Sequence, residues 1–399
     1  MITSRKFSLL ALSISMAVLL FVGVINFFID GDSSRHLPTD RSGIPRTTNH
    51  SALSKLHYIY QQQPDVMYFG SSRVEVGMPV EPVLFKPMSV YNAGLSANSL
   101  GNTVPLIMHV LGGYSPKVIV LGVDYFSFTA KPSPLSNLDM SLLSENFSEY
   151  RLKRLLHDVK RSVTVDTSHN SITALRALYT DRPYDAIDGV ASVGGQTSKN
   201  EMLRLTATRG HYVKAFQRTL QYANSPPPTT AEIRAGLNMF EDFVAVACAR
   251  KITVRVFSNP RHALAEYLLA KNGHWGEVER WKAALADIAT RHKSDCDLKI
   301  FDFTGFNSVT TEPIGPMTAA AGLENYWEAS HYKDNVGKLI LKRMFADDPS
   351  LPTDFGRELD NETVSVINPL VRRNLEEYEA SHPKEIRLAT DWLKVDTVD

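Results

Sequence analysis

Two short stretches of the sequence carry residue types that could together perform acyl chemistry. In "DVMYFGSSR", Ser71, Ser72 and Arg73 come directly after a short apolar run. In "EASH", Glu328 and His331 are three residues apart. Residues at that spacing share one turn, so the carboxylate can orient the imidazole ring. An imidazole held in this way can take a proton from a serine hydroxyl and make the serine a nucleophile.

The elements that would position these residues are indicated by an alternation that begins near residue 65. Short β-branched or aromatic runs alternate with longer segments of helical character. This pattern predicts an α/β fold of right-handed βαβ units, with a mostly parallel five-stranded sheet between helices. The predicted strands are residues 65–69, 89–93, 117–123, 252–258 and 298–303.

Polar residues follow several of these strands, where an open parallel sheet binds its ligands. Arg73 follows the first strand, Asn98 lies after the second, and His262 lies after the fourth. We therefore expect Arg73, Asn98 and His262 to line a substrate pocket.

Each candidate also has a purely structural interpretation. Ser72 could be a turn hydroxyl, and His331 could cap a helix or pack in the core. Glu328 could serve a helix start without taking part in catalysis. Gly94, in "NAGLSANS", could be needed only for a tight turn.

The sequence resembles the SGNH (GDSL-type) hydrolase superfamily over roughly residues 56–130 and 236–346. More narrowly, it is similar to the membrane-anchored bacterial branch that includes the lipoteichoic-acid D-alanylation and alginate O-acetylation proteins. The matching motifs are "FGSSR", "NAGLSANS", "LGVDYF" and "EASH". The resemblance implies a flavodoxin-like three-layer fold.

The resemblance also implies a role for each matching residue. Ser72, rather than Ser71, would be the nucleophile, and Glu328 and His331 would be the acid–base pair. The amides of Ser72 and Gly94 would supply the oxyanion hole.

Two positions depart from the pattern of that superfamily. Its third motif normally presents an asparagine whose amide donates to the oxyanion, whereas this chain has Asp124. An ionised carboxylate only accepts hydrogen bonds, so Asp124 would be protonated or would instead hold Arg73 beside the serine. The acid of the last motif is more often aspartate, and Glu328 is one methylene longer.

The amino terminus predicts a membrane anchor. Residues 7–29 form a run of 23 residues without a charge, and about 20 such residues span a bilayer. Arg5 and Lys6 precede the run and Asp30 follows it, so residues 1–6 should lie in the cytoplasm. A cleaved signal peptide is the competing interpretation, but the apolar run is long and lacks a small-residue cleavage site.

The remaining chain is expected to lie outside the bacterial cytoplasmic membrane, in the periplasm, as one domain with additions. The expected parts are a linker at residues 30–55, an SGNH-like domain at 56–346 that contains a helical insertion at 131–235, and a charged tail at 347–399.

Composition narrows the class of function. The formal net charge is zero, which gives no sign of a nucleic-acid binder. No metal-site motif or glycine-rich phosphate loop is present, so we expect no cofactor or metal.

Cys248 and Cys296 could pair, although Cys248 lies in an apolar run typical of a small core residue. A basic run around Arg151 and Lys160 could meet anionic glycans or lipid headgroups, or be a solvated helix face.

These patterns predict an extracytoplasmic serine esterase or acetyltransferase that acts on a cell-surface polysaccharide or another acylated polymer. A membrane-bound acyltransferase would be its partner. The alternative is a non-catalytic protein that binds polymer or scaffolds a modification complex, which the substitution at Asp124 favours. A simple lipase or thioesterase is a third, weaker interpretation.

Overall fold

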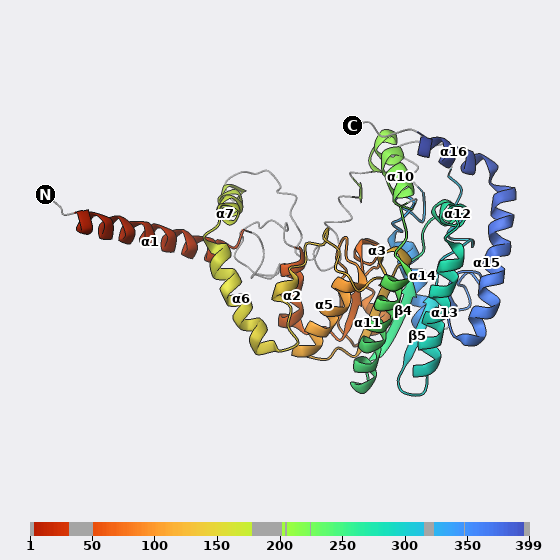
Figure 1. The fold of residues 1–399 in the computed structure, drawn as a ribbon, viewed down its shortest axis with the longest axis horizontal. Coiled ribbons are helices and arrows are strands. Elements are labelled where there is room, and N and C mark those ends of the chain that lie inside the picture. The colour runs from red at the N-terminus through yellow and green to blue at the C-terminus, as the bar shows by residue number, and fades with distance from the viewer. Residues whose placement is uncertain are drawn as a thin grey trace. The chain divides into compact units, whose positions relative to one another are not determined.

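The computed structural model describes residues 4–31, 51–177, 202–203, 206–223, 225–314, 323–346 and 348–394 (Figure 1). These residues form two compact units. We call them the helical unit and the sheet unit, and describe each by itself. The linker expected at residues 30–55 falls largely outside the described residues.

The sheet unit contains six strands and most of the helices. Its strands are β1 (Val66–Phe69), β2 (Val90–Asn92), β3 (Val118–Val123), β4 (Thr253–Ser258), β5 (Leu298–Asp302) and β6 (Arg357–Glu358). Its helices are α3 (Ser72–Gly77), α4 (Pro82–Phe85), most of α5 (Leu100–Gly113), α10 (Arg209–Ala223), α11 (Thr230–Ala249), α12 (Ala263–Lys271), α13 (Trp275–His292), α14 (Asp334–Phe345), α15 (Asn361–Ser381) and α16 (Pro383–Lys394).

The strands form one sheet in the order β2-β1-β3-β4-β5-β6. The first five strands are parallel, which confirms the α/β class, and β6 pairs antiparallel with β5. The expected five-stranded sheet is therefore corrected to six strands of mixed direction. A strand of only two residues in a charged segment has no periodicity that could reveal it.

Strand order reverses at β1, which pairs with β2 on one side and β3 on the other. All residues of β1 and β3 are buried, as expected for central strands of a parallel sheet. Helices α11 and α13 contact each other as well as β4 and β5, whereas α3 packs against α14. The residues after β1 thus emerge where ligands bind in such sheets.

Parts of the expected insertion and of the expected tail belong to the sheet unit. Within 131–235, the helix α10 belongs to the sheet unit and contacts α12 and α16. The tail expected at 347–399 contains β6, α15 and α16, and α15 packs on α13. The charges that suggested a tail are those of the exposed helix faces.

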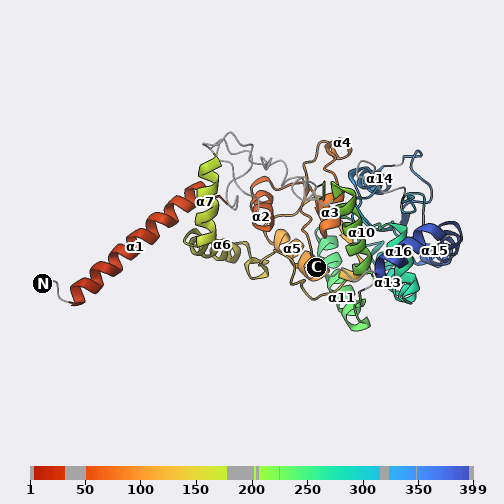
Figure 2. The same ribbon diagram turned by 90° about the horizontal axis from the view of Figure 1, so that it is seen from above.

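The helical unit is built from α1 (Ser4–Ile29), α2 (Ser51–Gln62), α6 (Phe147–Ser162) and α7 (Val165–Ala177) (Figure 2). By length and composition, α1 could cross a membrane, and it is the one such helix among the described residues. Most of its apolar side chains are exposed, so they do not form part of a protein core.

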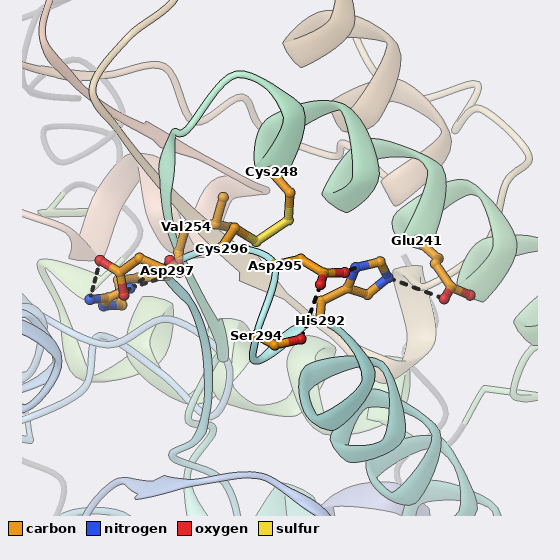
Figure 3. Close-up of a disulfide and its surroundings, with 9 residues drawn as sticks. Glu241, Cys248, Val254, His292, Ser294, Asp295, Cys296 and Asp297 are labelled. Carbon is orange, nitrogen blue, oxygen red and sulfur yellow. Dashed lines mark hydrogen bonds and ion pairs between the residues drawn. A yellow bond between two sulfur atoms is a disulfide. The ribbon is translucent and has the colours of Figure 1, made fainter.

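A disulfide joins Cys248, near the end of α11, to Cys296, just before β5 (Figure 3). The prediction that Cys248 is a core residue is wrong, because the side chain is half-buried and bonded to Cys296. The bond closes a loop that includes β4, α12 and α13. It therefore restrains the unfolded chain across the middle of the sheet.

Replacing both cysteines by serine should lower the free energy of unfolding. The cysteines are 48 positions apart, and the chain-entropy relation for such a loop gives a loss of up to about 4 kcal/mol. Urea denaturation of the detergent-solubilised protein, with and without reductant, measures this loss. Reductant should destabilise the wild type but not C248S/C296S. A wild type insensitive to complete reduction would contradict the prediction.

Candidate active site

The turn from β1 into α3 places Ser72 at the carboxyl edge of the sheet. Gly70 adopts a φ of +151°, and a Cβ there would lie 2.5 Å from Val74 Cγ2 and 2.8 Å from Gly122 O. Only glycine fits this close approach without displacing its neighbours. Helix α3 then starts at Ser72, whose side chain is half-buried and so remains reachable from solvent.

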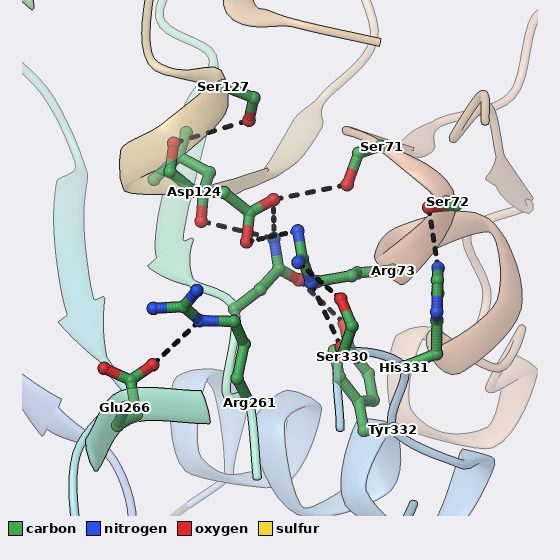
Figure 4. Close-up of polar contacts among 12 residues, drawn as sticks. Ser71, Ser72, Arg73, Asp124, Ser127, Arg261, Glu266, Ser330, His331 and Tyr332 are labelled. Carbon is green, nitrogen blue, oxygen red and sulfur yellow. Dashed lines mark hydrogen bonds and ion pairs between the residues drawn. The ribbon is translucent and has the colours of Figure 1, made fainter. Parts of the chain in front are cut away.

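Ser72, His331 and Glu328 form a continuous hydrogen-bonded relay. Ser72 Oγ lies 2.8 Å from His331 Nε2 (Figure 4). On the other side of the ring, His331 Nδ1 is hydrogen-bonded to Glu328 Oε1. A carboxylate accepts only, so Nδ1 carries the proton and Nε2 is left to accept the serine proton. The structure therefore brings together the three residues that the sequence singled out.

The carboxylate of Glu328 is fixed by the turn that it helps to form. Its Oε2 accepts from the Ser330 amide at 2.8 Å, and its Oε1 also accepts from the His331 amide at 3.0 Å. Burial alone would raise the pKa of Glu328, but the His331 imidazole and the hydrogen bonds from the Thr219 side chain and the Ser330 amide outweigh it and hold the pKa below its ordinary value. Glu328 is therefore ionised at neutral pH, as a group that orients and stabilises an imidazolium must be.

Arg73 connects the serine helix to the histidine turn. Its guanidinium forms an ion pair with Asp124 at 2.9 Å, and the two side chains are only 10% and 8% exposed. It also donates to Ser330 O at 3.1 Å and to Ser330 Oγ at 2.5 Å. Because Ser330 directly precedes His331, one buried cation holds both ends of the Ser72–His331 contact in place. We call this set Arg73, Asp124 and Ser330 the arginine clamp.

Asp124 acts only as a hydrogen-bond acceptor in this structure. In addition to pairing with Arg73, Asp124 accepts through its Oδ2 from Ser71 Oγ at 3.2 Å (Figure 4). The same oxygen accepts from Asn259 Nδ2 at 3.2 Å. The Tyr332 hydroxyl donates in turn to Asn259 Oδ1 at 3.0 Å. Of the two alternatives left by the sequence, the geometry favours the one in which Asp124 holds Arg73 beside the serine.

The two expected amide donors of the oxyanion hole differ in their surroundings. The Gly94 amide donates to Asn92 Oδ1 at 2.9 Å, so in this geometry it is directed at a side chain. Asn92 also donates to the carbonyls of Val74 and Met78 at 2.8 Å each, which ties this loop to α3. The Ser72 amide has no acceptor among the described residues and could donate to a substrate oxygen.

Asn98 and His262 are both buried. Asn98 Oδ1 accepts from Ser136 Oγ at 2.5 Å, while its Nδ2 is buried without a partner. His262 caps α12: its Nδ1 accepts from the Leu264 amide at 3.2 Å and its Nε2 donates to Glu312 O at 2.8 Å. Burial lowers the pKa of His262 to about 4, so its ring is neutral. The residue is 0% exposed, so it does not line an open pocket.

A small polar cavity borders the arginine clamp. It has a volume of about 30 Å³ and is lined by Arg73, Asp124, Arg261, Glu266 and Lys282 among others. Arg261 pairs with Glu266 at 2.9 Å, and Lys282 pairs with Asp302 at 2.7 Å. The volume suits one or two water molecules but no substrate. No cluster of metal-ligating side chains occurs in the described part of the chain.

The positioning roles of three residues were not predicted from the sequence. Ser330 lies inside "EASH", and Asn92 lies two positions before Gly94, so their motifs were noticed but their hydrogen bonds were not. Asn259 follows β4 and contacts Asp124. Its position at a strand end is visible in the sequence, but its contact with Asp124 is not.

Replacing Asp124 by asparagine would leave the Arg73 guanidinium buried without its counter-charge. We expect the free energy of unfolding of D124N to fall by about 3–5 kcal/mol, as measured by urea denaturation. The control is Glu379→Gln, which breaks a pair with Lys271 whose side chains are 44% and 46% exposed, and which should cost less than about 1 kcal/mol. Equal losses would contradict a buried clamp.

Glu328 should also govern part of the acid sensitivity of the fold. Its pKa is lower in the folded than in the unfolded chain, so its stabilising contribution is present above the ordinary glutamate range and is lost as the pH falls through and below that range. E328Q should therefore have a flatter free energy of unfolding between about pH 5 and pH 3. Urea titrations across this range measure it. Parallel profiles for E328Q and the wild type would contradict the lowered pKa.

Comparison with known proteins gives no independent identification of this site. No protein-family model matches the chain, and neither does any curated protein sequence or solved structure.

Proposed function

We propose that the protein is a membrane-anchored, extracytoplasmic serine esterase or acyltransferase of SGNH type. The single observation that carries this proposal is the relay from Ser72 Oγ through the His331 ring to the buried Glu328 carboxylate. A turn hydroxyl or a helix-capping histidine would not need a carboxylate on the far side of the ring.

The proposed reaction is acyl transfer through a covalent serine ester. His331 Nε2 takes the proton of Ser72 as Oγ attacks the carbonyl carbon of an ester. Glu328 stabilises the resulting imidazolium, and the Ser72 amide donates to the oxyanion of the tetrahedral intermediate. When this intermediate collapses, His331 gives its proton to the departing alkoxide. Water or an acceptor hydroxyl then attacks the acyl-serine while His331 takes its proton. As the bond between the acyl group and Oγ breaks, His331 returns this proton to Ser72 Oγ, which regenerates the serine and releases the acid or the new ester.

The strand order of the sheet supports a flavodoxin-like fold of SGNH type. The order of the first five strands, 2-1-3-4-5, is that of flavodoxin-like sheets, whose ligand site lies between β1 and β3. Ser72 follows β1 and Asp124 follows β3, so both lie at that position. This agrees with the three-layer SGNH-type architecture suggested by the resemblance of the motifs.

The extracytoplasmic location has two independent supports. The basic residues Arg5 and Lys6 precede the apolar run of α1 and acidic residues follow it, which favours a cytoplasmic amino terminus and an external body. A disulfide between Cys248 and Cys296 is expected where the surroundings are oxidising. A surface polysaccharide substrate and a membrane-bound acyltransferase partner fit this location, although their identity rests on the resemblance alone.

The scarcity of oxyanion donors favours a second function, that of a non-catalytic protein. Asp124 offers no donor to an oxyanion, and the Gly94 amide is directed at Asn92. Loss of one oxyanion donor slows acyl transfer by a factor of about 10² to 10³. A protein with so few donors could serve as a non-catalytic polymer-binding or scaffold component, and reactivity of Ser72 separates the two functions.

The detergent-solubilised protein should react with a fluorophosphonate at Ser72, as located by peptide mass spectrometry. S72A should lose the label, and H331A should react at least about 100-fold more slowly, since general-base catalysis contributes that much. Ser71→Ala is the matched control, because the Ser71 hydroxyl donates to Asp124 instead, and it should keep the label. A folded wild type without a label at Ser72 would refute the enzymatic function and favour the scaffold.

A further inference from the structure

Helix α6 of the helical unit buries its polar side and exposes its apolar side. The buried positions follow one another at a spacing of four residues and are Tyr150, Arg154, Asp158 and Ser162. The exposed apolar positions form a stripe on the opposite side. They are Leu152, Leu155, Leu156 and Val159, exposed by 58%, 57%, 63% and 58%.

This orientation is fixed by an ion pair. Arg154 Nε lies 2.9 Å from Asp158 Oδ1, and both side chains are about nine-tenths buried. Turning the helix to hide its leucines would bring this pair out into water. A surface helix of a water-soluble protein has the reverse arrangement, with its apolar stripe toward the core. The exposed stripe therefore needs an apolar environment outside the unit.

Hydrogen bonds connect the end of α6 and the start of α7 to the last turns of α1. Asn26 Nδ2 donates to Ser162 O and to Ser168 Oγ, each at 2.8 Å. A Cβ at Gly23 would lie 3.2 Å from Val163 Cγ1, so the glycine permits close packing. Figure 2 shows α6 and α7 meeting beside this end of α1. Gly23 is six residues, or about 9 Å, from the end of α1 at Ile29.

That distance matches the depth of an interfacial helix, which lies about 5–10 Å into the boundary between headgroups and acyl chains. If α1 crosses the bilayer, the junction of α6 and α7 is at this boundary. The apolar surface also continues from α1 to α6, because Phe27, Leu152 and Leu155 line one open hollow of about 730 Å³. Lipid chains can fill such a hollow.

The charges beside the stripe fit a lipid surface. Arg151, Lys153 and Lys160 flank the stripe on α6, and Lys153 pairs with the neighbouring Glu149. Long basic side chains can keep their charge in the headgroup region while their stems lie on apolar surface. Anionic phosphates complement these charges, whereas the same face of a second copy would repel them.

We propose that α6 lies in the outer headgroup region of the membrane that α1 crosses, with its leucine stripe inserted and its basic side chains at the lipid phosphates. This inference rests on the anchoring role of α1 in the proposed function and not on catalysis by Ser72. The helical unit then has two attachments to the bilayer, a spanning helix and a surface helix, which together fix its orientation.

The test measures membrane depth at single positions of the full-length protein. Because the native cysteines are joined in a disulfide, cysteines introduced at L156C, V18C and V366C can be spin-labelled one at a time. Each protein is reconstituted in nanodiscs with phosphatidylglycerol as about a third of the lipid. The accessibility of each label to oxygen and to a water-soluble nickel chelate reports its depth. Val366, 66% exposed on α15, is the matched apolar control.

We expect the label at 156 to favour oxygen over the nickel chelate, as the label at 18 should, whereas the label at 366 should favour the chelate. A label at 156 that behaves like 366 while 18 is buried would overturn the surface helix and leave the anchor intact. Chelate access at all three positions would overturn the anchor as well. A strong spin–spin coupling between labels at 156 would assign the stripe to a second copy and also overturn the proposal. Labelling of Ser72 by fluorophosphonate on the same samples reports the catalytic proposal separately.

Discussion

In the sheet unit, the guanidinium of Arg73 lies between the carboxylate of Asp124 and the carbonyl of Ser330. Taking a charge out of water is costly unless it is paired and hydrogen-bonded. The arginine clamp meets that cost only when the β1–α3 turn, the end of β3 and the turn before His331 are all in place. Three segments far apart in the sequence are thereby brought to one edge of the sheet, and the spacing between Ser72 and His331 follows from them.

The relay of Ser72, His331 and Glu328 depends on the arginine clamp for its geometry. The buried Glu328 fixes the His331 ring through its Nδ1 and through the backbone of the same turn. Arg73 fixes that turn relative to α3, so the distance of 2.8 Å from Nε2 to Ser72 Oγ is set by neighbours and not by the two residues alone. An Asp124 that offered a donor to the substrate could not also neutralise Arg73. The carboxylate at this position therefore has a structural reason.

Most of the fold and the three residues of the relay could be predicted from the sequence, because both leave local signals. The apolar runs of β1 and β3 and the three-residue spacing of Glu328 and His331 are visible without a structure. Long-range partners are not: nothing near Arg73 indicates Ser330, 257 positions away. His262 was misleading because a polar residue at a strand end can cap the next helix as readily as it can line a pocket. Likewise, the sequence alone does not indicate which side of α6 is exposed, because this orientation depends on its buried ion pair.

The most direct test of this account is the rate at which fluorophosphonate modifies Ser72 when the clamp is broken and the relay is untouched. R73M and D124N keep Ser72, His331 and Glu328, and each is compared with the wild type at a temperature where circular dichroism shows it to be folded. We expect a rate at least about tenfold lower in both variants, since a misplacement of about 1 Å can cost up to 100-fold. A wild-type rate in folded R73M and D124N would show instead that the relay assembles without the clamp.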